Sequence, residues 1–220
     1  MTDDTTGLIA TVCFVLFLAW FMFATFANRR KLIATSRWMS EFAEPFGGSV
    51  SIKWISSSAF HFTIQGMSEP FSQCVISVLL KPRDLIAMLL INRLIRRNDL
   101  LLIRCELTSQ PIWGLEIYRP RTILSGLAKR EIATEQWQES ASADGRFRIA
   151  HGGGRAERLA RILLERFQDR RGQVWRLSVR RRFPQLLIAI DLPELDSQNA
   201  AELRLLLEAL ANYLKEYSTV

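Results

Sequence analysis

The run His151-Gly152-Gly153-Gly154 contains the residue types that come closest to a catalytic motif. A His-Gly-Gly-Gly run forms the oxyanion loop of lipases and esterases, where it works with a nucleophilic serine in a Gly-x-Ser-x-Gly turn. The sequence has no such turn, because its nearest candidate, residues 47–51, reads Gly-Gly-Ser-Val-Ser. Its two histidines, His61 and His151, also give no Ser-His-acid set. The sequence therefore argues against a hydrolase.

The same glycines allow a second kind of chemistry, the binding of a phosphate group. A strand followed by glycines and a helix N-terminus can present backbone N–H groups to phosphate, and Arg155 follows directly. The run lacks the Lys-Ser/Thr pair of a Walker loop and the glycine spacing of a dinucleotide site. A flexible turn is the better interpretation.

Cysteine and histidine, which supply most ligands for transition metals, are scarce. Neither histidine is near a cysteine or a carboxylate cluster in the sequence, so we predict no metal site and no cofactor. Cys13 falls in a long apolar run, whereas Cys74 and Cys105 each stand alone in a strand-like segment. We therefore predict core thiols and no disulfide framework.

Arginine is unevenly distributed along this chain of net charge +7. Of the 29 basic residues 24 are arginine, and residues 146–182 hold twelve of them against three acidic residues. The planar guanidinium suits phosphate groups, on anionic lipids or on nucleic acid. An ordinary solvated surface on an arginine-rich chain is the alternative.

The strand predicted at residues 174–180 places several of these arginines on one face. Its period of two places Arg176, Arg180 and Arg182 on one face and apolar residues on the other. No aromatic residue is interleaved on the arginine face, which favours contact with phosphate over stacking on bases. The predicted phosphate-binding or ribosome-binding set, taken as uncompensated by acidic residues, is Arg170, Arg171, Arg176, Arg180, Arg181 and Arg182.

A membrane anchor is predicted ahead of this basic region. Residues 8–27 are twenty residues without charge, proline or glycine, about the length that crosses a hydrocarbon core of roughly 30 Å. The preceding residues carry Asp3 and Asp4 and no basic residue, which is unlike a cleaved signal peptide. Basic flanks stay in the cytoplasm, so we expect an outer N-terminus and a cytoplasmic domain. The flanking residues are Arg29, Arg30, Lys31 and Arg37.

The next elements follow from apolar periodicity. A neck helix is expected within residues 28–48, ended by Pro45 and the Gly47-Gly48 pair. Alternating apolar residues on both sides of a serine-rich turn predict a hairpin over residues 50–65. Residues 73–80, apolar on both faces, predict a central strand.

Residues 82–97 predict a helix with more apolar residues than one core-facing stripe requires. One apolar strip shares its side with arginines, so it could contact the membrane or the transmembrane helix of a partner. Full burial is the equally weighted alternative. The predicted contact residues are Leu85, Leu89, Arg93 and Arg96.

A strand–strand–helix unit is expected twice, over residues 100–131 and 174–217. Residues 133–145 between them predict a mobile loop and a possible sub-boundary, followed by a strand at 146–150 and a helix at 155–168. The predicted fold class is α+β: one transmembrane helix, then a cytosolic domain of β-β-α modules. The predicted segments are an outer N-terminus at 1–7, the transmembrane helix at 8–27, the neck at 28–48 and the domain at 49–220.

Several segments, taken in order, carry a family resemblance. They are Asn28-Arg29-Arg30-Lys31 at the anchor exit, Trp38 in the neck, residues 75–85 (VISVLLKPRDL), the strand pair after Asn98-Asp99, and residues 186–193 (LLIAIDLP). This order, with the Leu-Lys-x-x-Asp-Leu junction, resembles the cytosolic part of the calumin family. Calumin is the single-pass, coiled-coil-containing subunit of the ER complex called the protein associated with translocon.

The resemblance implies a non-enzymatic role, in which the protein binds the ribosome near its exit tunnel and helps new membrane proteins to insert or assemble. The implied partners are the ribosome with its RNA and a multipass membrane protein. Only seven residues precede the span where calumin has an acidic lumenal domain, and the chain ends at Val220 where calumin continues into a Lys-rich coiled coil. Lumenal calcium binding and ribosome binding through that tail are therefore not carried over. These absences fit a minimal prokaryotic relative, such as an archaeal one, in the plasma membrane; a eukaryotic one would lie in the ER.

We therefore expect a membrane-anchored accessory factor for membrane-protein insertion or assembly, which acts without catalysis and without a small-molecule substrate. The main alternative is a scaffold whose arginines bind anionic lipid headgroups.

Overall fold

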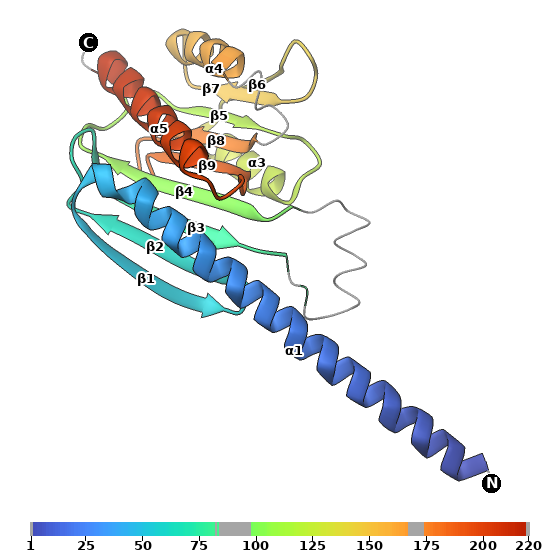
Figure 1. Cartoon of the computed structure of the whole chain (residues 1–220). Helices are drawn as coiled ribbons and strands as arrows, with labels where there is room; N and C mark the ends of the chain where they lie inside the picture. Colours follow the sequence, from blue (N-terminus) through green and yellow to red (C-terminus); the bar gives the residue numbers. More distant parts are fainter. Residues whose placement is uncertain (1, 82, 84–97, 167–173, 219–220) are drawn as a thin grey trace.

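The computed structural model describes residues 2–81, 83, 98–166 and 174–218 (Figure 1). It shows a mixed fold in which a long N-terminal helix leads into a domain of helices packed on an antiparallel sheet. The predicted contact residues Leu85, Leu89, Arg93 and Arg96, with their helix, lie outside the described residues. So do Arg170 and Arg171.

The predicted anchor and neck form one uninterrupted helix, α1 (Thr2–Ala43). Side chains from residue 8 to residue 23 are exposed, and this part is long and apolar enough to cross a membrane. Beyond it, one stripe of α1 faces the domain core. The stripe consists of Ala24, Asn28, Leu32, Thr35, Met39 and Phe42, all buried.

Helix α1 ends where the sequence predicts, through Pro45 and the glycine pair. A 3-10 turn (Glu44–Phe46) follows it, and the chain then reverses through Gly47 and Gly48, whose φ angles are 67° and 84°. A Cβ atom on Gly48 would lie 2.2 Å from the backbone oxygen of Gln65. Glycine is therefore required both for the left-handed backbone and for the close approach of the next hairpin.

The predicted hairpin and central strand are confirmed. Strand β1 (Ser49–Ser56) pairs with β2 (Ala59–Gln65), and β2 pairs with β3 (Phe71–Leu79), all antiparallel. Strand β3 also pairs with β4 (Leu100–Leu107), so it is central, as its two apolar faces indicate. Strand β1 forms one edge of the sheet, and all its residues are exposed.

The sheet has nine strands in the order β1-β2-β3-β4-β9-β8-β5-β7-β6. Its second half consists of β5 (Leu115–Tyr118), β6 (Gln138–Ala141), β7 (Arg148–His151), β8 (Val174–Val179) and β9 (Leu186–Asp191). The predicted repeat of β-β-α modules is wrong, because β4 and β5 are not neighbours. The β8–β9 hairpin lies between them, and apolar residues on both of its strands fill the centre of the sheet.

The helices cover opposite faces of the sheet. The domain half of α1, α4 (Gly154–Arg166) and α5 (Ser197–Ser218) share one large core with the inward side chains of seven strands, as Figure 1 shows for α1 and α5 lying side by side. Helix α3 (Ile123–Glu135) packs on the other face, over Tyr118 and Ala150. The two helices of the predicted modules, α3 and α5, are therefore not equivalent.

A side-chain hydrogen bond connects α1 to the start of α5. The indole Nε1 of Trp38 donates a hydrogen bond of 2.7 Å to the backbone oxygen of Asp196. The carboxylate of Asp196 in turn accepts a 2.6 Å bond from the backbone N–H of Asn199 and caps α5, as the sequence predicts. Trp38 is 3% exposed, so this bond is made in the core.

Residues 133–145 are not only a loop. They contain the end of α3 and the edge strand β6, which pairs with β7. All four residues of β6 are exposed, so neither of its faces shows the apolar alternation by which a strand is recognised in a sequence. One sheet runs across the predicted sub-boundary.

Cys74 and Cys105 are buried, as predicted, but they are not separate thiols. They face each other across β3 and β4 and form a disulfide, with their Cα atoms 4.1 Å apart. The cause is the register of two strands that are distant in sequence, which brings two core positions opposite each other. Cys13 is a free, exposed thiol in α1.

Candidate functional site

The arginines of the β8–β9 hairpin lie on one side of the sheet, as predicted, but they are not uncompensated. Arg176, Arg180 and Arg182 all turn toward the face that α3 covers, and each forms an ion pair with a glutamate. The acidic partners come from β5 and α3, which are 49 to 60 residues away in sequence. The prediction of an uncompensated ladder is therefore wrong for these three residues.

Arg176 is part of the domain interior. Its Nε and Nη2 atoms donate to the two carboxylate oxygens of Glu116, at 2.5 and 3.1 Å, and the two side chains are 3% and 0% exposed. A buried guanidinium held by a two-point contact of this kind is not available to an external phosphate. Arg176 is therefore engaged with Glu116 inside the fold and is not exposed to an external ligand.

Glu131 of α3 joins the other two arginines. It accepts bonds of 2.9 Å from Nη1 of Arg180 and from Nη2 of Arg182. Burial lowers the pKa of Arg180 from its usual value, whereas the nearby carboxylates of Glu116 and Glu131 oppose that shift. Arg180 is largely buried, but the Arg182 side chain is 59% exposed and reaches solvent.

Two separate features of the sequence, the glycine run and the arginine hairpin, meet around one cavity of about 300 Å³. We call this cavity the arginine pocket. Its described lining is Gly114, Glu135, Trp137, Gly152, Arg180, Arg181 and Arg182. Trp137 was not among the sequence candidates. A large aromatic residue inside an otherwise polar stretch is the signal that could have identified it.

The glycines of the pocket make room for Trp137. A Cβ atom on Gly114 would lie 2.0 Å from Cζ2 of the indole, and one on Gly152 would lie 3.0 Å from its Nε1. Gly152 also donates a backbone hydrogen bond of 3.1 Å to Gly114. The His-Gly-Gly-Gly run is therefore the turn from β7 into α4, and one of its glycines lies against an aromatic ring.

Arg181 supplies positive charge to the arginine pocket, and Arg182 adds an exposed guanidinium that is already paired with carboxylates. Both are exposed, and Arg181 is oriented by hydrogen bonds from its Nε and Nη2 to the backbone oxygen of Ile112, the first of 2.8 Å. Arg182 is shared between Glu131 and Glu135, at 2.9 and 3.9 Å. Oriented guanidinium groups beside an indole and small residues are suited to an anionic group such as phosphate.

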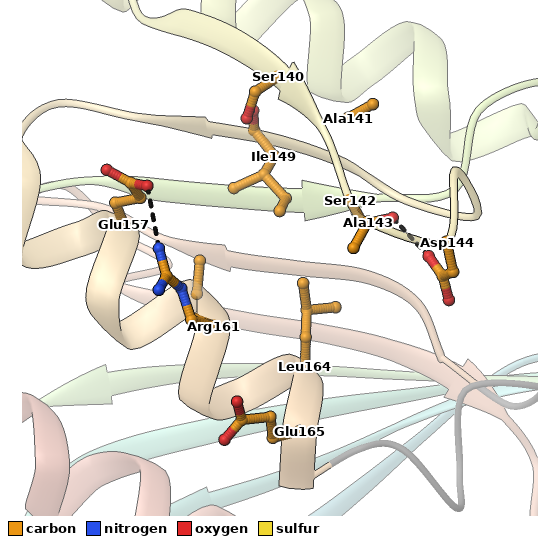
Figure 2. A pocket seen from close by; sticks show the side chains of 11 residues that line it. Ser140, Ala141, Ser142, Ala143, Asp144, Ile149, Glu157, Arg161, Leu164 and Glu165 are labelled. Carbon is orange, nitrogen blue, oxygen red and sulfur yellow. Dashed lines mark hydrogen bonds and ion pairs between the residues drawn. The ribbon is translucent and has the colours of Figure 1, made fainter.

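A second cavity, of about 670 Å³, lies between α4 and the edge of the sheet (Figure 2). Its floor includes Ile149 of β7 and Leu164 of α4, and one wall is β6 with the turn after it. Arg161 pairs with Glu157 at 3.5 Å, and Ser142 donates to Asp144 at 2.6 Å, so the polar residues drawn there partly satisfy one another. Of the sequence-predicted site residues that the structure describes, none lines it.

Within the described part of the chain, no group of three or more histidine, cysteine or acidic side chains is placed to hold a metal ion. Comparison of the sequence with family models and with curated proteins gave no match.

Proposed function

We propose that this protein is a single-pass, membrane-anchored accessory factor that assists the insertion or assembly of other membrane proteins by docking and not by catalysis. The observation that carries the proposal is the continuity of α1. One helix supplies both an exposed apolar segment of membrane-spanning length and a buried stripe in the domain core. The domain is thereby held where polypeptides enter and leave a bilayer.

The orientation in this proposal rests on the charge around the span. Arg29 and Arg30 are exposed directly after the apolar segment, whereas residues 1–7 contain two aspartates and no basic residue. Basic flanks favour the cytoplasmic side, so the domain faces the cytoplasm. The Cys74–Cys105 disulfide favours the opposite side, because disulfides are rare in the cytoplasm. We give the flank more weight, since strand register alone places these two cysteines face to face in any compartment.

The arginine pocket is the docking surface that the geometry supports best. Its mouth carries Arg181 and Arg182, and its wall contains an indole, a combination that suits a phosphate group on single-stranded or looped RNA. Ribosomal RNA is the partner to which we assign it. The proposed contact with RNA involves fewer arginines than the sequence indicates, because Arg176 and Arg180 form ion pairs with glutamates within the domain.

Binding to ribosomes at a series of salt concentrations tests this assignment. The full-length chain in nanodiscs is mixed with purified ribosomes and sedimented, with and without the double change Arg181→Ser and Arg182→Ser. The slope of log affinity against log salt should fall by about 0.7 to 0.9 for each lost phosphate contact. The control changes the same charge at Arg146 and Arg158, which are exposed and outside the pocket lining.

Three outcomes can be told apart in that assay. A flattened slope for the pocket variant alone supports docking to RNA through the pocket. Equal slopes for wild type and variant on ribosomes contradict it. If, in a parallel flotation assay, the variant binds ribosomes like the wild type but loses binding to vesicles of anionic lipid, the alternative function, a scaffold for lipid headgroups, is the correct one.

A further inference from the structure

The turn between β1 and β2 lies beside α1 at the point where the apolar segment of the helix ends. A groove of about 550 Å³ separates them, and its described lining is Thr25, Arg29, Leu32, Ile33, Trp54, Ser56 and Ser57. The predicted span ends at Ala27. The turn is therefore level with the end of the span, although more than twenty residues separate the two in sequence.

The chain path explains this position. After α1 ends at Ala43, the chain reverses at the glycine pair and β1 runs back along the helix. Eight strand residues cover about 26 Å, which equals about 17 residues of helix. Counting back 17 residues from Ala43 reaches Phe26. The length of β1 thus returns the chain to the end of the predicted span, and Figure 1 shows β1 running back along α1.

The side chains at this end of β1 are apolar and exposed. Trp54 and Ile55 are 50% and 52% exposed, and Ile33 of α1, across the groove, is 40% exposed. Tryptophan is enriched at membrane interfaces, where its ring sits at the level of the headgroups. In water, such a patch of large apolar residues would be unfavourable.

Positive charge surrounds the same patch. Arg29 and Arg30 on α1 and Lys53 on β1 are exposed. Lys31, by contrast, is paired at the domain surface, because its Nζ lies 2.6 Å from Oδ2 of the buried Asp99. Asp99 also accepts a 2.6 Å bond from the backbone N–H of Lys81, which fixes this end of β3 to α1. Arg29, which lines the groove, and the exposed Arg30 next to it are therefore placed to face anionic headgroups, whereas Lys53 alternates with Trp54 and lies on the other face of β1.

We infer that the β1–β2 turn is a second membrane contact, with Trp54 and Ile55 inserted in the headgroup layer of an anionic bilayer beside α1. The inference rests on the proposed anchoring of α1. Two contacts on opposite sides of the groove restrict the rotation of the domain about the helix axis, which a single helix would leave unrestricted. The partner at this surface is lipid, whereas the arginine pocket is assigned to RNA.

Depth-dependent quenching in vesicles tests the inference on the full-length chain. A Cys13→Ser chain receives one new cysteine, Ser57→Cys at the turn, which is labelled with an environment-sensitive fluorophore. The vesicles contain phosphatidylcholine, phosphatidylglycerol and a lipid with a nitroxide near its headgroup. The matched control is Ser49→Cys, which is exposed at the other end of the same strand, about 26 Å away. We expect quenching several-fold stronger at position 57 than at position 49.

A second variant separates insertion from simple proximity. Changing Trp54→Ser and Ile55→Ser together should reduce quenching at position 57 to the level at position 49. Each side chain is about half buried, and the Trp54 ring packs on Phe60 with the ring centroids 5.3 Å apart, so the melting temperature should fall and quenching is compared at a temperature where the variant is still folded. Equal quenching at the two positions in protein that floats with the vesicles would overturn the turn contact and leave the anchor intact. Protein that does not float would overturn the anchor as well.

Discussion

Arg176 and Glu116 form a buried two-point ion pair across β8 and β5, beneath α3. Neither side chain is accessible, and the pair joins two segments that are 60 residues apart. Removing one partner leaves an uncompensated charge in the interior, which costs about 3–5 kcal/mol, whereas replacing both with apolar residues of similar volume is often neutral.

The first prediction follows from this pair. Arg176→Met or Glu116→Leu alone should lower the free energy of unfolding by about 3–5 kcal/mol, and the double variant should recover most of that loss. Denaturant unfolding in mild detergent, followed by tryptophan fluorescence, measures both quantities. Single variants of wild-type stability would show that the pair is not the structural link described above.

The second prediction concerns Gly114 in the arginine pocket. Gly114→Ala brings a methyl group into the indole of Trp137 and should cost about 1–3 kcal/mol through overpacking. Gly126→Ala is the matched control, because it lies in helix α3 with nothing within 4 Å of its Cβ position. That change should stabilise the protein by about 0.4–1 kcal/mol. Thermal unfolding of the two variants should therefore shift in opposite directions.

The third prediction is a pH dependence that arises from His61. Its pKa is lowered by burial and by the nearby positive charges of Arg104 and Lys53, and its Nδ1 lies 2.8 Å from the hydroxyl of Ser77. The unfolded chain then binds more protons than the folded chain below about pH 6.5, so this contribution to stability is present above that pH and is lost below it.

Replacing His61 with glutamine should remove that dependence. The melting temperature of the wild-type chain should fall more steeply than that of His61→Gln as the pH is lowered from neutral through the usual range of histidine titration. Differential scanning fluorimetry of both chains across this range makes the comparison. Parallel curves would exclude His61 as the cause.

The fourth prediction uses the oxidation state of Cys74 and Cys105 to determine on which side of the membrane the domain lies. A cytoplasmic domain should contain reduced Cys74 and Cys105 in cells, because the cytoplasm keeps thiols reduced. Denaturing lysis in an alkylating reagent should then modify all three cysteines, as read by intact mass. A chain alkylated only at Cys13 until a reductant is added would place the domain in an oxidising compartment and reverse the proposed topology.

Local elements of this fold could be predicted from the sequence, and their partners could not. The apolar run of α1, the hairpin around residues 56–58 and the doubly apolar β3 each show the periodicity of a single element. The position of the β8–β9 hairpin between β4 and β5 depends on pairing between segments far apart in the chain, for which periodicity gives no signal.

The candidate site shows the same division. The common face of Arg176, Arg180 and Arg182 follows from strand geometry, and it is where the sequence predicts it. Whether those charges are available depends on Glu116 and Glu131, which lie on other elements and reach the arginines only in three dimensions. No strand pattern points to Trp137, because β6, which begins directly after it, has no buried face.

The unbroken helix α1 has a mechanical consequence. The segment from Ala27 to Ala43 is about 24 Å long and is fixed to the domain by Trp38, so in the proposed anchored state it would act as a lever that pivots at the bilayer surface. Transmembrane helices tilt to match the thickness of the hydrocarbon layer. A change in tilt of about 10° would move the Ala43 end by about 4 Å. With the anchor in place, thinner or thicker membranes would change the inclination of the domain, and with it the direction in which the arginine pocket faces.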